Sequence, residues 1–306
     1  MSSSSKNLQL INAMIGMCRR DAKWPHHLYD LGYGVKWIEY PFTCGNGETI
    51  APDLVIVSSE LNSCLLCECK SGSNIDDDQA DRYKSVQPGD VVTKLFVDAP
   101  GGVSPTVDIP YLCFSEAAPS IIRQLTAVSA MFPVVEMSPN SIRLVANNFT
   151  VSKVTKVFKA GVTIDRNRIP MCYVPFDTDS SDSEIAPLVM QTLVAFASQN
   201  KPHFKRDEIA KDVVGDLWES FGEQKKKDLR NKVMAILGKA QQRELRGFLK
   251  RNGELWALSY SFPTSKTFPT RRLKLLSKKC NAFVKRIRDE ERAEGRQLPL
   301  FSDQTL

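Results

Sequence analysis

The stretch PDLVIVSSELNSCLLCECK, Pro52–Lys70, decides the fold of this chain. Its two apolar runs, Asp53–Val57 and Cys64–Lys70, are separated by a polar turn, which is typical of two strands joined in a hairpin. On the second strand Glu68 and Lys70 are two positions apart, so their side chains project from the same face of a sheet. The stretch therefore predicts a hairpin with charged side chains on one face.

Three charged side chains of this hairpin suit metal-dependent hydrolysis. Asp53 begins the first strand and can meet Glu68 and Lys70 across the hairpin. Two carboxylates can hold Mg²⁺ or Mn²⁺ with waters in the remaining positions, and the Cys69 carbonyl could serve as a further ligand. Such a cation acidifies a bound water and stabilises charge on a phosphate, while a lysine orients the water. The side chains of Cys67 and Cys69 should face the opposite, packed side.

The segments on either side of the hairpin predict an α/β core with a mixed sheet. Apolar residues recur at helical spacing over Asn7–Arg20, and a short helix is expected at His26–Leu31. Residues from about Val134 to Pro175 are β-rich but irregular. The other elements expected in the core are the strand Val35–Tyr40, the helix Asp76–Val86 and the strands Val91–Val97 and Tyr111–Phe114.

The motif Pro52-Asp53 with Glu68-Cys69-Lys70 resembles the signature of the PD-(D/E)xK nuclease superfamily, also called the restriction-endonuclease-like fold. The core order of that superfamily, helix–strand–strand–strand–helix–strand, agrees with the order expected over about residues 7–115. The resemblance implies a restriction-endonuclease-like mixed sheet flanked by helices. It also implies that Asp53 and Glu68 bind Mg²⁺ and that Lys70 aids the water that attacks a phosphodiester.

A second motif, Gln79-Ala80-Asp81-Arg82-Tyr83, resembles the QxxxY element of the RecB-type branch of that superfamily. Gln79 and Tyr83 are four positions apart, so they lie on one face of the expected helix and can turn towards the metal site. The resemblance implies that both residues help to place the lysine and the DNA. The alternative is an ordinary amphipathic helix with Tyr83 packed and Gln79 exposed.

Two features of the superfamily have no definite counterpart in this sequence. Members often carry a further acid or a histidine upstream, and Asp21, His26, His27 and Glu39 are all candidates. The cysteine pattern of the iron–sulfur members is absent. Because positions three apart on a strand face opposite ways, we expect the cysteines of the second hairpin strand to be core residues.

Charge is distributed unevenly along the chain. Of the 41 Lys and Arg residues, 25 lie from Lys201 onward, against 14 of the 35 Asp and Glu residues. A basic last third fits polyanion binding, and a solvated basic surface is the alternative. The acidic, serine-rich stretch Asp177–Glu184 predicts a domain boundary. We therefore expect a nuclease domain over residues 1–176, a DNA-binding domain over 185–262, and a basic helix and tail over 263–306.

The region after this boundary is mostly helical and ends in a hairpin. Helices are expected at Glu184–Gln199, Arg206–Val214 and Gly222–Gln242, followed by a hairpin that turns at Asn252-Gly253. This order resembles a winged helix-turn-helix, with the recognition helix near Lys225–Leu237. A winged-helix module that binds proteins is the alternative. The residues expected to contact DNA are Lys225, Lys226, Lys227, Arg230, Lys250 and Arg251.

The last segment carries two further signals. A basic helix over about Arg271–Arg292 would add nonspecific affinity for phosphates. The tail Gln297-Leu298-Pro299-Leu300-Phe301 resembles the pentapeptide by which bacterial replication and repair proteins bind the sliding clamp. The resemblance implies that the apolar Leu298, Leu300 and Phe301 dock on the clamp while Gln297 fixes the register. Packing of these apolar residues on their own domain is the alternative.

The composition argues against membrane and secreted locations. No apolar run approaches the roughly 20 residues of a membrane span. The N-terminal MSSSSKNLQ has no apolar signal core, and the eight cysteines lack paired spacing, which is typical of reduced thiols. We therefore expect a cytoplasmic protein with no membrane partner, located at the bacterial nucleoid.

Together these patterns predict a Mg²⁺-dependent or Mn²⁺-dependent DNA endonuclease that acts in phage defence, a mobile element or DNA repair. Two alternatives stay open. One is a catalytically silent DNA-binding or regulatory protein on a nuclease fold, and the other is an RNA nuclease that uses the same chemistry. Because uncontrolled cleavage of host DNA would be toxic, we also consider an activating partner subunit.

Overall fold

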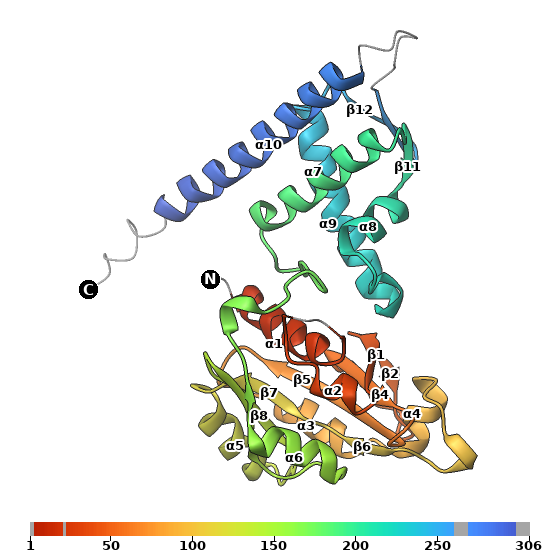
Figure 1. Ribbon diagram of the computed structural model, residues 1–306, viewed down its shortest axis with the longest axis vertical. Helices are drawn as coiled ribbons and strands as arrows, with labels where there is room; N and C mark the ends of the chain where they lie inside the picture. Colours follow the sequence, from red (N-terminus) through yellow and green to blue (C-terminus); the bar gives the residue numbers. More distant parts are fainter. Residues whose placement is uncertain (1–2, 21–22, 260–268, 298–306) are drawn as a thin grey trace. The chain divides into compact units, whose positions relative to one another are not determined.

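The structure is a computed structural model that describes residues 3–20, 23–259 and 269–297. The chain divides into two compact units, whose elements are labelled in Figure 1. The first unit comprises Met1–Pro175 together with Leu217–Lys226, and the second comprises Phe176–Asp216 together with Lys227–Leu306. The sequence predicts a division near residue 176, but it does not predict the return of Leu217–Lys226 to the first unit.

The first unit is a mixed α/β fold built on one mixed sheet. In the described part of the chain this sheet has eight strands: β1 (Gly34–Ile38), β4 (Leu54–Ser58), β5 (Ser63–Lys70), β6 (Thr106–Asp108), β7 (Tyr111–Phe114), β8 (Val134–Met137), β9 (Ser141–Ala146) and β10 (Val162–Thr163). Their order is β1-β4-β5-β7-β8-β9-β10, and β6 pairs with the start of β5. The predicted hairpin is formed by β4 and β5, which are antiparallel, whereas β5, β7 and β8 are parallel.

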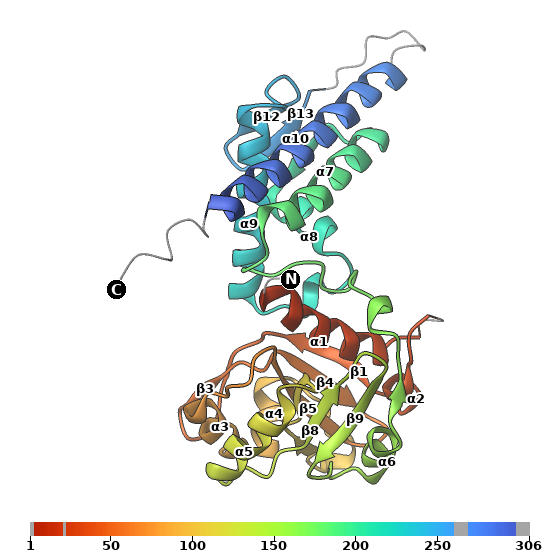
Figure 2. The ribbon, with the colours of Figure 1, turned by 90° about the vertical axis from the view of Figure 1, so that its left-hand side faces the viewer.

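Helices lie on both sides of this sheet (Figure 2). They are α1 (Ser3–Met17), α2 (His27–Asp30), α3 (Asp77–Lys84), α4 (Pro88–Lys94), α5 (Ala118–Ala127) and α6 (Ser152–Ala160). The short strands β2 (Phe42–Thr43) and β3 (Thr49–Ile50) pair with each other. Residues of α3, α4 and α5 share one apolar core with Val55, Leu66 and Tyr111 of the sheet. The helix α1 packs on β5, and α6 packs on β9.

One predicted strand is wrong. Val91–Val97 was expected to be a strand, yet α4 spans Pro88–Lys94. Pro88 occupies the first turn of this helix, and the Asp90 carboxylate accepts a hydrogen bond from the Gln87 N–H at 3.0 Å. These helix-start features outweigh the modest strand preference of valine. The irregular region after Val134 likewise contains a helix, α6, beside its short strands.

The second unit is mostly helical. Its elements are α7 (Asp182–Ser198), β11 (His203–Lys205), α8 (Arg206–Val214), α9 (Glu223–Gln242), β12 (Leu249–Asn252), β13 (Leu255–Leu258) and α10 (Pro269–Gln297), and the first turn of α9 belongs to the first unit. The strands form a small antiparallel sheet in the order β11-β13-β12. The predicted helices and the hairpin of this region are present, whereas β11 was not predicted.

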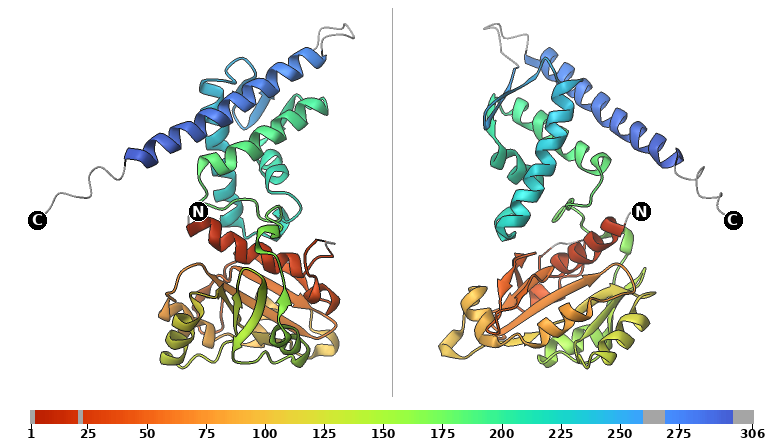
Figure 3. Two further views of the ribbon diagram at one scale, coloured as in Figure 1. Left: turned by 60° about the vertical axis from the view of Figure 1, so that its left-hand side comes forward. Right: turned by 180° about the vertical axis from the view of Figure 1, so that it is seen from behind.

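The long helix α10 is amphipathic and runs alongside α7 (Figure 3). It buries Leu276, Cys280, Phe283 and Ile287. Its exposed basic residues include Lys274, Lys278, Lys279, Lys285 and Arg288. Among the helices of the described residues, none combines the length and the apolar character that crossing a membrane requires.

Candidate active site

The β4–β5 hairpin brings the predicted acids and the lysine together at one end of the sheet. Asp53 directly precedes β4, and the antiparallel register places it beside the Glu68 end of β5. The Cys69 N–H donates a hydrogen bond to Asp53 Oδ2 at 2.6 Å, which fixes this carboxylate. On the same face, Lys70 Nζ lies 2.9 Å from Glu68 Oε1. The side chain of Glu68 is buried, and that of Lys70 is 18 % exposed.

The helix α3 supplies the remaining predicted residues of this site. Asp76 caps the helix by accepting a hydrogen bond from the Gln79 N–H at 3.0 Å. One turn apart on the same face, Gln79 Oε1 accepts a hydrogen bond from Lys70 Nζ at 3.1 Å, and the Tyr83 hydroxyl donates one to Glu68 Oε2 at 2.8 Å. Direct contacts therefore join the side chains of Glu68, Lys70, Gln79 and Tyr83, and the Cys69 N–H holds Asp53 beside them. We call these five predicted residues the carboxylate cluster: Asp53, Glu68, Lys70, Gln79 and Tyr83.

The electrostatics of the carboxylate cluster are dominated by burial. Desolvation raises the pKa of Asp53 well above its ordinary value, and the negative charge of Glu68 raises it further. The Cys69 N–H and the more distant Lys70 charge act in the opposite direction. Burial, followed by the charge of Glu68, also raises the pKa of Tyr83, so this hydroxyl remains a proton donor at neutral pH. The cluster therefore carries more negative character than its single lysine balances.

The cysteines of β5 are core residues, as predicted. Cys64 belongs to the apolar core shared with α3, and Cys67 and Cys69 are buried as well. Burial raises the pKa of the Cys67 and Cys69 thiols well above the ordinary value, so these thiols are protonated and unreactive. For Cys69, a predicted metal ligand through its carbonyl, the contact with Asp53 is made by the N–H.

Among the upstream candidates in the described part of the chain, Glu39 contacts Asp53. Its N–H donates a hydrogen bond to the Asp53 carbonyl at 3.1 Å, and its charge contributes to raising the pKa of Asp53. Glu39 also adopts a positive φ of 46°, which is uncommon for this residue type. His26 instead lies 3.7 Å from Asp30 within the α2 region, and Asp21 lies outside the described residues.

The segment Leu217–Lys226 reaches the same part of the first unit from far along the sequence. The Gly222 N–H donates to the Ile38 carbonyl at 3.3 Å, and a Cβ at Gly222 would lie only 2.9 Å from the Glu39 carbonyl oxygen. This close approach requires glycine. One turn later, Lys225 Nζ lies 2.7 Å from Glu39 Oε1, with 10 % of its side chain exposed. Lys225 therefore pairs with Glu39, the residue whose N–H contacts the Asp53 carbonyl.

The six residues predicted to contact DNA fall into two groups. Lys225, Lys226 and Arg230 are held by acids of the protein; Lys226 Nζ lies 3.0 Å from Glu223 Oε1, and Arg230 pairs with Asp207. The other three are exposed: Lys227, Lys250 and Arg251.

The tail predicted to bind a clamp lies almost wholly outside the described residues. Gln297 is the last residue of α10. Leu298, Leu300 and Phe301 lie beyond it, outside the described part of the chain.

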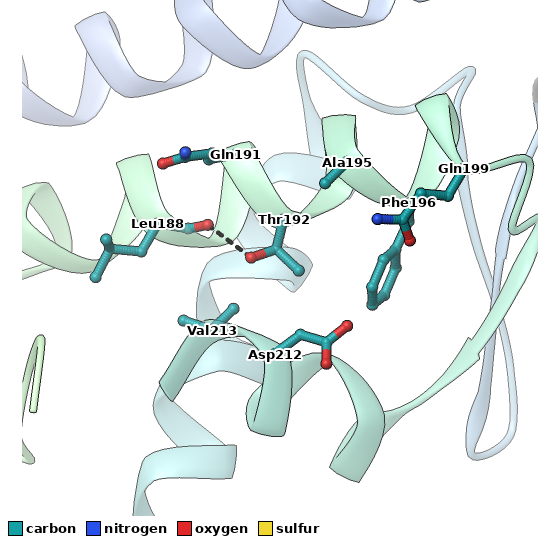
Figure 4. Close-up of a pocket in the computed structure, with 8 residues that line it drawn as sticks. All are labelled: Leu188, Gln191, Thr192, Ala195, Phe196, Gln199, Asp212 and Val213. Carbon is teal, nitrogen blue, oxygen red and sulfur yellow. Dashed lines mark hydrogen bonds between the residues drawn. The ribbon is translucent and has the colours of Figure 1, made fainter. Parts of the chain in front are cut away.

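A separate pocket of about 300 Å³ lies between α7 and α8 of the second unit (Figure 4). Phe196 and Val213 supply apolar walls, and Asp212 and Gln199 supply polar groups. The Thr192 hydroxyl donates to the Leu188 carbonyl at 3.1 Å. None of the predicted site residues lines this pocket.

Tyr111 of β7 was predicted only as a strand residue. It is fully buried, and its hydroxyl has no hydrogen-bond partner among the described residues. Tyr111 is in register with Glu68 on the neighbouring strand. A single tyrosine in an apolar strand carries no sequence signal for such a position, because strand pairing alone brings it to the cluster.

The described residues contain no group of three or more His, Cys, Asp or Glu side chains arranged to hold a metal ion. The potential ligands in the carboxylate cluster are the oxygens of Asp53 and Glu68. Burial, and then the charge of Glu68, raise the pKa of Asp53, and a bound cation would favour its charged form. Hard oxygen donors of this kind fit Mg²⁺ or Mn²⁺, which bind through one or two carboxylates and keep several waters.

Comparison with known proteins places the first unit in a family. The chain is 25 % identical over 212 residues to a Methanocaldococcus jannaschii protein named "Uncharacterized protein MJECL32". The alignment covers 63 % of this chain and 47 % of that relative, so the chain spans about half the length of the curated relative it matches. No solved structure matches the chain. The MJECL32 domain model matches residues 6–174, more than half of the chain, which therefore belongs to the MJECL32 domain family.

Proposed function

We propose that the first unit hydrolyses phosphodiester bonds with the help of a divalent cation, as the resemblance to PD-(D/E)xK nucleases implies. One observation carries this proposal: side-chain contacts join Glu68 and Lys70 to Gln79 and Tyr83, and the N–H of the intervening Cys69 holds the Asp53 carboxylate. If the two short motifs had matched by chance, contacts between their residues would not be expected. A buried carboxyl group with a raised pKa, such as that of Asp53, is also typical of functional sites.

The proposed roles follow from these contacts. Asp53 and Glu68 hold the cation, which supplies positive charge for the phosphate and an acidified water. The side chain of Lys70 is partly exposed at the cluster, and its ammonium group would hydrogen-bond the attacking water and orient it. Gln79 fixes the lysine through its amide oxygen, and Tyr83 fixes the Glu68 carboxylate by occupying one of its oxygens.

We also propose that the first unit has a restriction-endonuclease-like core. The supporting order along the chain is α1, β1, β4, β5, α3 and β7, which is helix–strand–strand–strand–helix–strand once the short α2, β2–β3, α4 and β6 are set aside. Within the sheet, the strand that carries Glu68 and Lys70 lies between the Asp53 strand and β7. Both motifs then lie where that superfamily carries its catalytic residues.

We further propose that the second unit is a winged helix that binds DNA. Its order α7, β11, α8, α9, β12 and β13, with the sheet order β11-β13-β12, is that expected of a winged helix. Exposed Lys250 and Arg251 on the β12–β13 hairpin and Lys227 on α9 are available to phosphates. These features favour DNA over RNA as the substrate.

The proposed chemistry fits three biological roles. A DNA endonuclease of this kind would act in phage defence, a mobile element or DNA repair, and a clamp-binding tail at Gln297–Phe301 would recruit it to replicating DNA. A requirement for an activating partner subunit would restrain cleavage of host DNA. A silent DNA-binding protein is the second candidate, and the complete cluster argues against it.

Cleavage of plasmid and oligonucleotide DNA with Mg²⁺ or Mn²⁺ tests the proposal. We expect the full chain to cut DNA, and Asp53→Ala and Lys70→Ala to lose that activity. Asp81→Ala is a matched control, because Asp81 is an exposed acid of α3 that pairs with Lys84. It should cut like the wild type.

Three outcomes would change the proposal. Cleavage that survives Asp53→Ala would contradict the assignment of the site. Cleavage of RNA but not DNA by the same preparation would keep the chemistry and change the substrate. A folded protein that cuts neither substrate, with or without a sliding clamp, would favour the DNA-binding candidate or an absent activator.

A further inference from the structure

Tyr111 lies at the start of β7, directly beside Glu68 of the carboxylate cluster. The two residues are in register on parallel strands, and the Glu68 N–H donates to the Pro110 carbonyl at 3.0 Å. Residues in register on neighbouring strands project from the same face of a sheet, so the Tyr111 and Glu68 side chains share one face. The Tyr111 ring stacks on Phe132 with 5.9 Å between ring centroids, in the apolar core that also contains Tyr83.

The hydroxyl of Tyr111 is an unpaired buried donor. The residue is fully buried, and its hydroxyl oxygen has no hydrogen-bond partner among the described residues. Leaving such a group unpaired is unfavourable, because its hydrogen bonds to water are lost on folding and are not replaced. Burial, and then the charges of Glu68, Asp76 and Asp53, raise the pKa of Tyr111. The hydroxyl therefore keeps its proton at neutral pH and lies in the field of the cluster's carboxylates.

Two other buried tyrosines of the first unit differ from Tyr111 in this respect. The Tyr83 hydroxyl donates to Glu68 Oε2 at 2.8 Å, and the Tyr33 hydroxyl donates to Ser63 Oγ at 2.8 Å. Each of these hydroxyls is accounted for by a protein acceptor. Packing does not account for the third, because phenylalanine would stack on Phe132 equally well. Its partner is therefore expected to be a molecule other than the protein.

We propose that the Tyr111 hydroxyl donates a hydrogen bond to a water molecule in the hydration shell of a divalent cation held by Asp53 and Glu68. This inference rests on the proposed function, because it presupposes a cation at those carboxylates. Tyr111 is a positioning residue that acts through the water and does not touch the cation. Groups that orient metal-bound ligands typically change metal affinity by about 10-fold to 100-fold.

Mn²⁺ binding to the full chain, measured by electron paramagnetic resonance of the free ion, tests this inference without relying on cleavage. We expect Tyr111→Phe to weaken Mn²⁺ binding by about tenfold. Its melting temperature in the absence of metal should not fall, since no protein hydrogen bond is lost. Tyr33→Phe is the matched control, because the Tyr33 hydroxyl binds Ser63 at the other end of β5. This variant should melt at a lower temperature than the wild type and should bind Mn²⁺ with the same affinity.

Asp53→Asn separates failure of this inference from failure of the proposed function. Unchanged Mn²⁺ affinity in Tyr111→Phe, with affinity lost in Asp53→Asn, would overturn the role of Tyr111 alone. Mn²⁺ affinity that neither substitution changes would overturn both proposals. A melting temperature of Tyr111→Phe as low as that of Tyr33→Phe would assign the hydroxyl a protein partner and would also overturn the inference.

Discussion

The pKa of Asp53 in the first unit and the pKa values of two glutamates in the second unit shift in opposite directions. In the carboxylate cluster of the first unit, burial and then the charge of Glu68 raise the pKa of Asp53. In the second unit, Arg286 donates hydrogen bonds to Glu244 at 2.7 and 3.1 Å and to Glu290 at 2.9 and 2.8 Å. The Arg286 hydrogen bonds lower the pKa of both glutamates.

This difference distinguishes the candidate site, the carboxylate cluster, from the structural ion pairs of Arg286. The glutamates around Arg286 are satisfied by the protein, because a guanidinium presents several donors in a fixed geometry. The carboxylates of the cluster are buried with one lysine and little solvent, an arrangement that stabilises the fold poorly unless something else binds there. Residues of the same charge therefore differ in role according to the partners that surround them.

The largest expected effect is on catalysis. Lys70→Met should lower DNA cleavage at saturating substrate by about 10²- to 10³-fold, as is typical when one charged group that stabilises a transition state is removed. Arg286→Met removes a cation from the second unit and should leave that rate unchanged. Gel-based single-turnover assays measure both, and an equal loss in the two variants would erase the contrast between the units.

A smaller effect is expected on the stability of the first unit. Asp53→Asn keeps the shape and can still accept the Cys69 N–H, but it removes a buried charge, so the free energy of unfolding should rise by about 0.5–2 kcal/mol at neutral pH. Because the folded pKa of Asp53 is raised, the wild type should lose stability relative to the variant as pH rises above about 4 and through the folded pKa. Urea unfolding at several pH values without metal checks this, and a less stable variant would contradict it.

The second unit should respond to pH in the opposite direction. Because Arg286 lowers the folded pKa of Glu244, the pair stabilises the folded state above the unfolded pKa, and this contribution is lost as pH falls through the folded pKa. Glu244→Gln should cost about 1 kcal/mol near pH 7, a figure kept small by solvent screening, and should reduce the loss of stability in acid. Hydrogen exchange of α10 at pH 7 and pH 4 measures this. Identical acid sensitivity in wild type and variant would contradict the assignment.

The smallest expected effect concerns lysines at the start of α9. Lys227→Ala should weaken DNA binding slightly and reduce the salt-dependence slope by about one, because the exposed Lys227 is free to contact a phosphate. Lys225→Ala should instead alter the first unit, since Lys225 is held by Glu39. Fluorescence anisotropy at several salt concentrations, with melting temperatures as a control, distinguishes them. Equal slopes for Lys225→Ala and Lys227→Ala would assign both lysines to DNA.

The sequence predicts most of the core and of the cluster because their signals are local. Two apolar runs separated by a polar turn predict the hairpin, and the spacing of Gln79 and Tyr83 places both on one face of a helix. Val91–Val97 was assigned wrongly because the helix start at Pro88 outweighs two valines. The positions of Tyr111 beside Glu68 and of Lys225 beside Glu39 could not be predicted, since strand pairing and packing between distant segments create them.

The glycine at position 222 has a consequence for how this protein can be divided or recombined. Phe221 forms a bridge with Ile38 of the edge strand β1, and Gly222 permits that approach. A chain cut once after residue 176 would lack this segment, so the β1 edge would be open to pairing with other molecules. A chimaera would therefore contain an intact first unit only if it includes Leu217–Lys226 together with the residues up to Pro175. The two units are interleaved in the gene, and a single crossover between them cannot exchange either one intact.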